Sequence, residues 1–351
     1  MSPEPSPPAS RGLRQPAEWD AHEACWLAWP SHEDLWLDAL GPVRDSFVAL
    51  ARTIADPDPG TGAPRGERLE VLVMDEAAEA TAQERLAGLG ARLHRIPFGD
   101  IWLRDTAPVF LAGPGGARAA ATFAFNGWGG KYVLPHDAEV AGRVAEAAGL
   151  PELRAGFVLE GGSVEVDGEG TCLTTRQCLL NPNRNPSMDA SRIEAELSSW
   201  LGAGKVLWLG DGLRNDHTDG HVDTVARFVA PARVVCMRSS SPRDPNREAL
   251  ETIERDLRSF RDALGRPLEV LTVPSPGLVP GPDGEPMPAS YVNFYVANTA
   301  VAVPVYGSPA DREAVETIAR LFPGRKVEGI PARDLLAGGG AFHCITQQQP
   351  R

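Results

Sequence analysis

A cysteine near the end of the chain follows three glycines, in the segment Gly338-Gly-Gly-Ala-Phe-His-Cys344. Glycines let the backbone adopt conformations that bring it close to a ligand, so the Cys344 thiol is a candidate nucleophile exposed in a cleft. The competing interpretation is a buried, unreactive cysteine, which is the usual fate of a lone cytosolic thiol. The pattern leaves these two interpretations about evenly balanced.

A second polar segment, His217-Thr-Asp-Gly-His-Val-Asp223, admits three interpretations. His217 and His221 have the spacing of two zinc ligands on a helix. Gly220 and the β-branched residues that follow instead favour an extended segment, in which His221 and Asp223 point to the same face. A solvated loop is the third interpretation, and we favour the His221–Asp223 catalytic pair.

Two further segments place carboxylates among Trp, Arg and Gly residues. Asp100 and Asp105 flank Trp102, and Glu160 precedes two glycines at the end of an apolar run. Each segment by itself also fits an exposed loop. A thiol, imidazole groups and several acids together are the parts of nucleophilic catalysis on a cationic carbon centre. Trp128, which stands among glycines, is the further tryptophan that we place near this site.

Alternating helical and strand-like patterns must position these groups. Five helices are expected at intervals of roughly 50 to 60 residues, each with two or three strands. They cover Glu76–Leu89, Asp137–Gly149, Asp189–Leu201, Asn246–Leu264 and Pro309–Leu321. Five repeated αβ units that close into a propeller-like ring would bring the polar segments to one centre. A mixed α/β sheet fits the pattern equally well.

Composition limits the class of protein. A formal net charge of −13 argues against a nucleic-acid partner, which would need a basic face. It suits a cationic small substrate only weakly, because many enzymes are acidic merely for solubility.

Five cysteines without a CxxC pair, and no apolar stretch typical of a signal peptide, predict reduced thiols and a cytoplasmic protein. No apolar run has the length of a membrane span. Residues 1–15, rich in Pro and Ser, are expected to form a disordered tail before a single catalytic domain over residues 16–351.

Eight segments, in order along nearly the whole chain, resemble the family of agmatine deiminases, which also holds the bacterial peptidylarginine deiminases. They are Pro16–Pro30, Asp100–Pro108, Phe125–Tyr132, Leu159–Thr175, Cys178–Pro186, Asp219–Asp223, Met287–Asn298 and Gly338–Pro350. So many long motifs in one order are specific for the family. The resemblance implies a five-bladed α/β propeller of pentein-like type, which agrees with the five helices, and no metal or organic cofactor. The oligomeric state stays open, a homodimer included.

The resemblance also assigns roles to matching residues. Cys344 is then the nucleophile, and His221 is the general acid and base. Asp105 and Asp223 grip the guanidinium group, and Glu160 supports His221. The implied reaction converts agmatine to N-carbamoylputrescine and ammonia through an amidino intermediate on the cysteine. Because two carboxylates should raise the pKa of the thiol, we expect a neutral Cys344 until the substrate cation binds.

The far end of the substrate is less certain from the motifs. Trp102 and Trp128 are expected to line the substrate site, and Asp216 and Asp219 are candidates to meet the distal amine of agmatine. Departures from the family pattern flank the proposed groups without replacing them. They are Ala107, His217, Thr224 and the pair Ala341-Phe342.

Other functions remain open on the sequence. A deiminase could act on another guanidino compound or on peptidyl-arginine. A metallohydrolase could use His217, Asp219 and His221. The pair Ala341-Phe342 also makes conceivable a catalytically silent protein that only binds guanidines. Ammonia release, chelator treatment and thiol modification would distinguish these classes.

Overall fold

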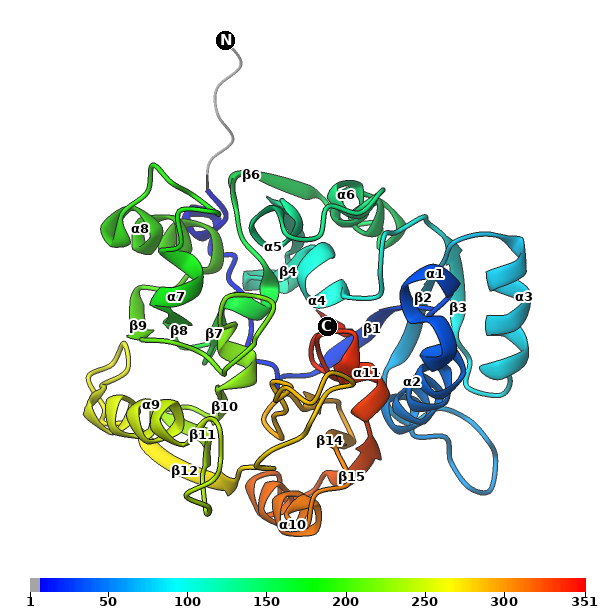
Figure 1. Ribbon diagram of the computed structural model, residues 1–351. Helices are drawn as coiled ribbons and strands as arrows, with labels where there is room; N and C mark the ends of the chain where they lie inside the picture. Colours follow the sequence, from blue (N-terminus) through cyan, green and yellow to red (C-terminus); the bar gives the residue numbers. More distant parts are fainter. Residues whose placement is uncertain (1–6) are drawn as a thin grey trace.

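The computed structural model describes residues 7–351, which form five small sheets placed around a common centre (Figure 1). The first sheet has the strand order β16-β1-β2-β3, and each of the other four has three strands. The strands, sheet by sheet, are β16 Gln347–Pro350, β1 His22–Ala28, β2 Arg68–Val73 and β3 Arg92–Arg95; β4 Val109–Ala112, β5 Arg118–Ala124 and β6 Glu152–Val158; β7 Glu165–Val166, β8 Thr171–Thr175 and β9 Lys205–Leu209; β10 Ala226–Ala230, β11 Arg233–Arg238 and β12 Glu269–Pro274; β13 Tyr295–Val296, β14 Ala300–Val305 and β15 Lys326–Pro331.

One pattern of pairing recurs in every sheet: an antiparallel pair followed by a parallel pair. Parallel neighbours need a crossover connection, which is usually a helix. The crossover helices are α2 Leu40–Ala55, α6 Asp137–Ala147, α8 Ala190–Leu201, α9 Arg247–Ser259 and α10 Asp311–Leu321. The predicted five-bladed α/β propeller is therefore confirmed, and the alternative of one mixed sheet is wrong.

The sequence misassigned the helix of the first blade. It counted α3 (Glu76–Arg85), which connects β2 to the additional strand β3, and passed over α2, which connects β1 to β2. Helix α2 buries Val43, Phe47 and Leu50 in the main hydrophobic core. This spacing is that of an amphipathic helix packed on a sheet.

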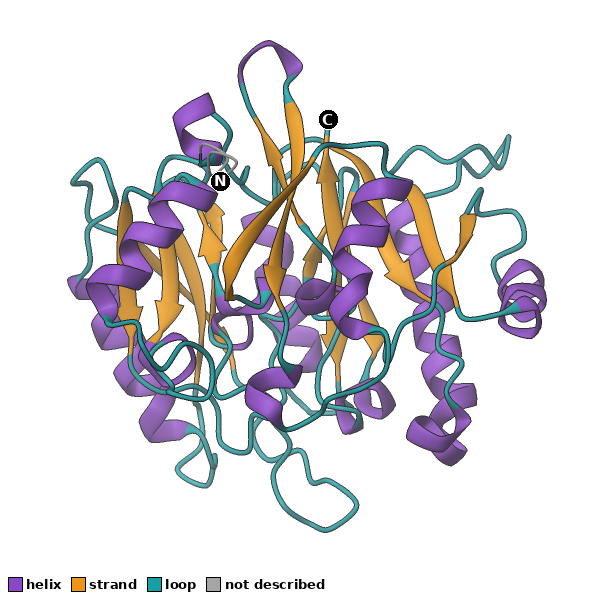
Figure 2. Cartoon of the chain, turned by 90° about the horizontal axis from the view of Figure 1, so that it is seen from above, coloured by secondary structure: helices purple, strands orange, loops and turns teal. Residues whose placement is uncertain are grey.

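Short helical turns complete the structure of the described residues. They are α1 Glu33–Trp36, α4 Leu103–Thr106, α5 Gly127–Gly130, α7 Arg176–Leu179 and α11 Arg333–Ala337, with the 3₁₀ turns η1 Pro8–Arg11, η2 Leu37–Ala39, η3 Pro114–Gly116, η4 Gly161–Ser163 and η5 Val222–Thr224. The strands run along the axis of the ring, with loops at both ends (Figure 2). No helix within residues 7–351 combines the length and the apolar character needed to span a bilayer.

Local sequence explains where the crossover helices begin and which face they bury. The Asp189 carboxylate accepts a hydrogen bond from the Arg192 N–H at 2.9 Å and caps α8. Helix α9 buries Leu250, Ile253 and Leu257, which share one face at helical spacing. Each blade is therefore a sheet covered by the apolar face of its own helix.

The two ends of the chain close the ring. Strand β16 pairs antiparallel with β1, and the Trp26 indole N–H donates to Gln349 Oε1 at 2.8 Å. The C-terminus consequently lies near the centre of the ring (Figure 1). Closure through the last strand holds the Cys344 segment at the centre, because Cys344 precedes β16 by only a few residues.

The predicted disordered tail is wrong for residues 7–15. Leu13 is buried, and Arg14 exchanges two backbone hydrogen bonds with Ala112, each 2.9 Å long. The Gln15 N–H donates to the Leu201 carbonyl at 3.0 Å. Leu13 supplies an apolar anchor and the backbone finds partners in two blades, so this Pro-rich segment is ordered. Residues 1–6 lie outside the described part of the chain.

Candidate active site

Four separate segments supply the five residues that the sequence singled out for catalysis. Asp105 lies in α4, Glu160 lies directly before η4, His221 and Asp223 lie at η5, and Cys344 lies between α11 and β16. All five are at least nine-tenths buried. Each segment lies in the connection from the last strand of one blade to the first strand of the next, and the fold brings these connections together.

The His221–Asp223 segment is not the extended strand that the sequence favoured. Val222–Thr224 form a 3₁₀ turn, and the Thr224 hydroxyl donates to the His221 carbonyl at 2.8 Å. A turn suits this place because two residues of one short segment must face a common centre.

Gly162 is the point at which three of these side chains converge. A Cβ atom added there would lie 2.6 Å from His221 Nδ1, 3.0 Å from Asp105 Oδ1 and 3.1 Å from Asp223 Oδ2. The Gly162 N–H also donates to Asp105 Oδ1 at 2.9 Å. Only a glycine lets the backbone occupy the space between the imidazole and the two carboxylates.

The Cys344 thiol lies beside one of these carboxylates. Its Sγ is 3.7 Å from Asp223 Oδ2 and 3.4 Å from Asn293 Oδ1. Burial and the negative charges of Asp223 and Asp105 raise the pKa of Cys344 well above its ordinary value. The thiol is therefore neutral in the free protein at pH 7, in agreement with the expectation from the sequence.

His221 has the opposite charge state. Burial alone would lower its pKa, but Asp105, Cys178 and Glu160 outweigh burial and hold the pKa well above its ordinary value. Its Nδ1 is 3.8 Å from Asp105 Oδ2, and its Nε2 is 3.8 Å from Glu160 Oε2. The imidazole is thus an imidazolium, able to donate a proton, whereas the Cys344 thiol keeps its own.

Glu160 is kept ionised by two cations. Burial raises its pKa, but His221 and Arg184 lower it further, so the net shift is downward. The Arg184 Nε–H donates to Glu160 Oε1 at 2.8 Å, and both side chains are fully buried. Arg184 lies in one of the matched segments, but no local feature of the sequence marked it as part of this site.

A cavity of about 300 Å³ opens beside the thiol. Its lining residues are Leu35, Trp36, Asp100, Trp102, Asp105, Trp128, Tyr132, Leu134, His217, Thr218, Ala337, Gly338, Gly339 and Cys344. Trp102 and Trp128 are thus at the cavity, where the sequence expected them. The Trp128 indole N–H donates to Asp105 Oδ2 at 2.8 Å.

The glycines before Cys344 leave room for two indole rings that line the cavity, those of Trp36 and Trp102. A Cβ atom at Gly338 would lie 2.4 Å from Trp36 Cη2, and one at Gly340 would lie 2.8 Å from Trp102 Cζ3. The indole N–H groups of Trp36 and Trp102 both donate to Asp100, at 3.1 and 2.8 Å. Gly338 and Gly340 therefore let the nucleophile segment pack against the indoles.

Asp216 and Asp219 do not take the place that the sequence proposed for them. Neither lines the cavity. Asp216 accepts hydrogen bonds from the Thr218 N–H and hydroxyl, at 2.8 and 2.6 Å. Asp219 binds Lys131 and Arg184, each at 2.5 Å. Both carboxylates bind neighbours within the protein, so the geometry gives no support to the prediction that they meet a distal amine.

The zinc interpretation of the His217–His221 spacing fails on geometry. His217 lies at the rim of the cavity and stacks on Tyr132 with 5.9 Å between ring centroids, whereas His221 is buried. Among residues 7–351, the one group of three side chains with ligand atoms close enough to share an ion is Glu160, Cys178 and His221. One oxygen of Glu160 in that group is already bound by Arg184.

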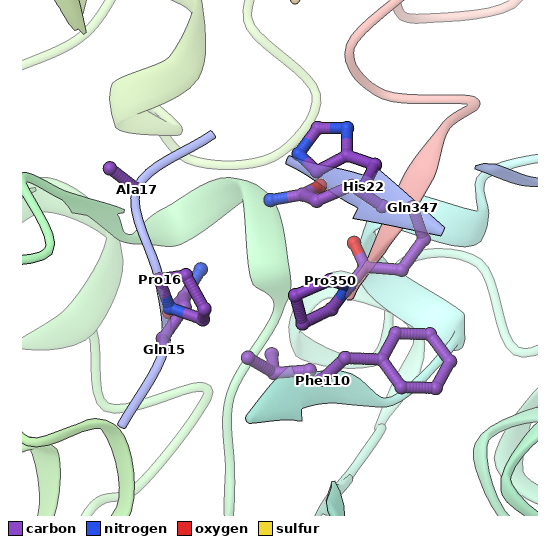
Figure 3. A pocket seen from close by; sticks show the side chains of 9 residues that line it. Gln15, Pro16, Ala17, His22, Phe110, Gln347 and Pro350 are labelled. Atoms are coloured by element: carbon purple, nitrogen blue, oxygen red, sulfur yellow. The ribbon is translucent and has the colours of Figure 1, made fainter. Parts of the chain in front are cut away.

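A second, much smaller pocket lies near the N-terminal segment (Figure 3). Its volume is about 10 Å³, and Gln15, Pro16, His22, Gln347 and Pro350 are among the residues around it. This is room for about one water molecule and not for a substrate.

Comparison with known proteins shows the family of the chain. Residues 14–350 match the family described as Porphyromonas-type peptidyl-arginine deiminase. The chain is similar to the agmatine deiminase of Ectopseudomonas mendocina (strain ymp), with 37% identity over 98% of this chain and 97% of that protein. It is also similar to that of Pseudomonas aeruginosa (strain LESB58), with 37% identity over 100% of this chain and 99% of that protein.

Among solved structures, the agmatine deiminase of Enterococcus faecalis superposes with a TM-score of 0.91 and 34% identity, covering 99% of this chain and 98% of that one. A more distant structure, the dimethylarginine dimethylaminohydrolase of Pseudomonas aeruginosa, has a TM-score of 0.52 and 13% identity, covering 93% of this chain and 99% of that chain. The distant likeness concerns the fold alone.

Proposed function

The chain belongs to the Porphyromonas-type peptidyl-arginine deiminase family, and we propose that it hydrolyses the guanidinium group of agmatine to N-carbamoylputrescine and ammonia. One observation carries the proposal. Asp105, His221 and Asp223 converge on Gly162, and the Cys344 thiol lies 3.7 Å from Asp223 at an aromatic cavity. This arrangement suits a planar cation held in front of a thiol.

Asp105 and Asp223 hold the guanidinium through charge-assisted hydrogen bonds. Asp223 Oδ1 has no hydrogen-bond partner within residues 7–351, although it is buried. The substrate N–H groups would satisfy this oxygen. Asp105 Oδ1 already accepts a hydrogen bond from the Gly162 N–H, and Oδ2 accepts one from the Trp128 indole N–H. Each carboxylate oxygen has a second lone pair that can accept a bond from the substrate.

The reaction follows from the charge states of Cys344 and His221. The bound cation offsets the two carboxylates, so the pKa of Cys344 falls and its proton leaves to solvent. The thiolate attacks the guanidinium carbon, and the His221 imidazolium protonates the departing amino group, which leaves as ammonia. A covalent amidino-cysteine remains. The neutral His221 then takes a proton from water, and the resulting hydroxide adds to the same carbon. The sulfur leaves and takes up the hydroxyl proton as the urea carbonyl forms, which restores the Cys344 thiol.

The distal amine of agmatine needs a partner at the far side of the cavity. Apart from Asp105, the carboxylate that lines the cavity is Asp100, which is held by the indoles of Trp36 and Trp102. Aromatic faces beside a carboxylate favour a cation. We therefore assign the amine to Asp100 in place of Asp216 and Asp219.

A panel of guanidines tests the function. Ammonia release should be fastest with agmatine, slower with N-butylguanidine, which lacks the amine, and slower still with arginine, whose carboxylate would approach Asp100. Cys344→Ala is the inactive control. Turnover of a blocked arginine peptide at a rate equal to that of agmatine would overturn the assignment. Binding without ammonia release would instead indicate a silent guanidine-binding protein.

The proposal also covers the domain organisation, the location and the oligomeric state of the protein. We propose that residues 16–351 act as a single catalytic domain, because the site draws on segments from Asp105 to Cys344 and the last strand closes the ring. All five cysteines are free and buried, which suits a reducing cytoplasm. Light scattering would test the homodimer that the sequence left open.

A further inference from the structure

A buried chain of charged groups lies behind the nucleophile and takes no part in the reaction just described. His343, the residue before Cys344, has Nδ1 2.6 Å from Asp223 Oδ2 and Nε2 2.7 Å from Glu18 Oε2. Glu18 in turn lies 2.7 Å from Arg227 Nη2. His343 therefore connects the substrate-binding Asp223 to a carboxylate near the N-terminus.

A carboxylate oxygen lies within hydrogen-bond distance of each ring nitrogen of His343. A carboxylate only accepts hydrogen bonds, and an imidazole has two ring N–H donors only as the imidazolium. Because a carboxylate oxygen lies at each ring nitrogen, the doubly protonated ring satisfies both contacts. His343, Glu18 and Asp223 are all more than nine-tenths buried, so water screens these contacts little.

The backbone of His343 is also held at both ends. Its N–H donates to the Asn293 carbonyl at 3.1 Å, and its carbonyl accepts from the Arg104 Nε–H at 3.2 Å. The Arg104 N–H donates to the Cys344 carbonyl at 3.1 Å. The backbone that carries the His343 ring is thus held in place by Asn293 and Arg104, and Arg104 also holds the carbonyl of Cys344.

Asp223 depends on this contact for its charge and its orientation. Burial raises the pKa of Asp223, but His343, His221 and Arg227 lower it further, and the net shift is downward. The His343 bond occupies Oδ2, the oxygen that faces the Cys344 sulfur. It leaves Oδ1, which has no partner within residues 7–351, for the substrate.

We propose that His343, clamped between Glu18 and Asp223, is a positioning residue that turns the free oxygen of Asp223 toward the guanidinium group. It acts through Asp223 and does not touch the substrate. The inference rests on the proposed function. Glu18 anchors the other side of the imidazolium, because it is itself held by Arg227 and by the Val296 N–H at 2.8 Å.

A purely structural role is the competing explanation, since breaking any buried ion pair destabilises a protein. Two amide substitutions separate the explanations. The side-chain nitrogen of Asn replaces His Nδ1, and that of Gln replaces His Nε2. His343→Asn therefore keeps a donor for Asp223 and loses Glu18, whereas His343→Gln keeps a donor for Glu18 and loses Asp223.

The matched control is a second buried histidine that bonds a carboxylate away from the cavity. His22 Nδ1 lies 2.8 Å from Glu67 Oε1, and both side chains are buried; His22 borders the small pocket of Figure 3. His22→Gln loses the donor at Nδ1, so it should lower the melting temperature and leave kcat/KM for agmatine unchanged.

The expected result is a difference between the two variants at residue 343. His343→Gln should lose about 100-fold in kcat/KM, the cost of misplacing a substrate-orienting group, and His343→Asn no more than about tenfold. Calorimetric titration of agmatine into the same variants on a Cys344→Ala background should show weaker binding for His343→Gln than for His343→Asn. Equal losses in both, or losses that follow the melting temperature as in His22→Gln, would overturn the proposal.

A wrong assignment of function can be distinguished from a wrong role for His343. If the unmodified protein releases no ammonia from agmatine, the proposed function is wrong, and titration of guanidinium chloride into the Cys344→Ala proteins still measures how His343 orients Asp223. If neither variant folds, Glu18→Gln replaces them. It should weaken guanidinium binding if the clamp orients Asp223, and unchanged binding would overturn the clamp.

Discussion

The proposed nucleophile and general acid occupy complementary protonation states in the free protein. Carboxylates around Cys344 raise the pKa of the thiol, and the pKa of His221 is raised as well. A thiol at high pKa is protonated and inert, whereas an imidazole at high pKa carries the proton that the leaving group needs. The positive charge of the substrate lowers the pKa of Cys344, so the thiol ionises when the substrate binds. His221 keeps its proton during this step.

The first prediction concerns the thiol. The ultraviolet absorbance of a thiolate should be absent from the free protein at pH 7 and should appear on mixing with a guanidine, because the cation lowers the pKa of Cys344. Burial also raises the pKa values of Cys25, Cys172, Cys178 and Cys236. Cys344→Ala should therefore abolish the signal. A complete thiolate signal without ligand would contradict this prediction.

A second prediction follows for Glu160. Glu160→Gln removes one of the charges that raise the pKa of His221, so the imidazolium should lose its proton at lower pH. Because His221 donates a proton in the first step, activity falls as pH rises through its pKa. The alkaline limb of the pH profile should shift to lower pH, and kcat at pH 7 should fall about 10²-fold. An unchanged profile would argue against this role for Glu160.

At the scale of elements, the reactive groups lie in short helical turns and not in the regular strands. Asp105 sits in the single turn α4, and Glu160 and Asp223 lie at the 3₁₀ turns η4 and η5. A turn can direct neighbouring side chains to one point, whereas residues in a strand alternate between faces. The crossover helices lie outside and contribute stability, so changes in the two kinds of element should have separable effects.

The turn at η4 yields the third prediction. Gly162→Ala would place a methyl group 2.6 Å from His221 Nδ1 and 3.0 Å from Asp105 Oδ1, so both must move and kcat/KM should fall at least about 100-fold. Gly156 in β6 is the matched control, because a Cβ atom there meets nothing within 4 Å. Gly156→Ala should retain activity. Steady-state ammonia release compares the two proteins, and equal activity would rule out convergence on Gly162.

The helix α8 yields the fourth prediction. Asp189→Ala removes the side-chain cap that accepts from the Arg192 N–H, and this should lower the free energy of unfolding by about 1 kcal/mol. The helix covers the outside of its blade, so kcat should not change. Urea denaturation followed by circular dichroism measures the stability. A loss of activity without a loss of stability would mean that α8 influences the site directly.

At the scale of the whole molecule, the ring is closed non-covalently by the two ends of the chain. Residues 22–26 pair with residues 347–350, and the nucleophile lies just before this last strand. Closure therefore couples global stability to the position of Cys344. The same closure makes the buried chain from Asp223 to Glu18 possible, because it brings the two ends together.

Loosening this closure is the fifth prediction. Gln349→Ala leaves the buried Trp26 indole N–H without its acceptor, which should lower the free energy of unfolding by about 1–3 kcal/mol. Differential scanning calorimetry measures the change. Arg351→Ala is the comparison: it removes an exposed side chain whose Nε–H donates to the His22 carbonyl at 3.1 Å, and its effect should be smaller because this bond is less buried. If neither change alters the free energy of unfolding, the pairing of β1 with β16 does not limit stability.

The sequence by itself determined four of the five crossover helices, the order of the motifs and the family. These are local properties: periodicity along a segment reports which face is buried, and a motif is recognised without knowing its partners. The same local reasoning located Cys344, His221, Asp223, Asp105 and Glu160. It mistook η5 for a strand, because β-branched residues express a propensity that tertiary contacts overrode.

Tertiary structure alone decided which side chains meet. The contact between Glu18 and His343 joins residues 325 positions apart, and nothing in either segment marks the other. It also decided that Asp219 is neutralised by Lys131 and Arg184 while Asp100 lines the cavity. A carboxylate looks the same in every sequence, and only its neighbours in the folded chain determine whether it is free to bind a substrate.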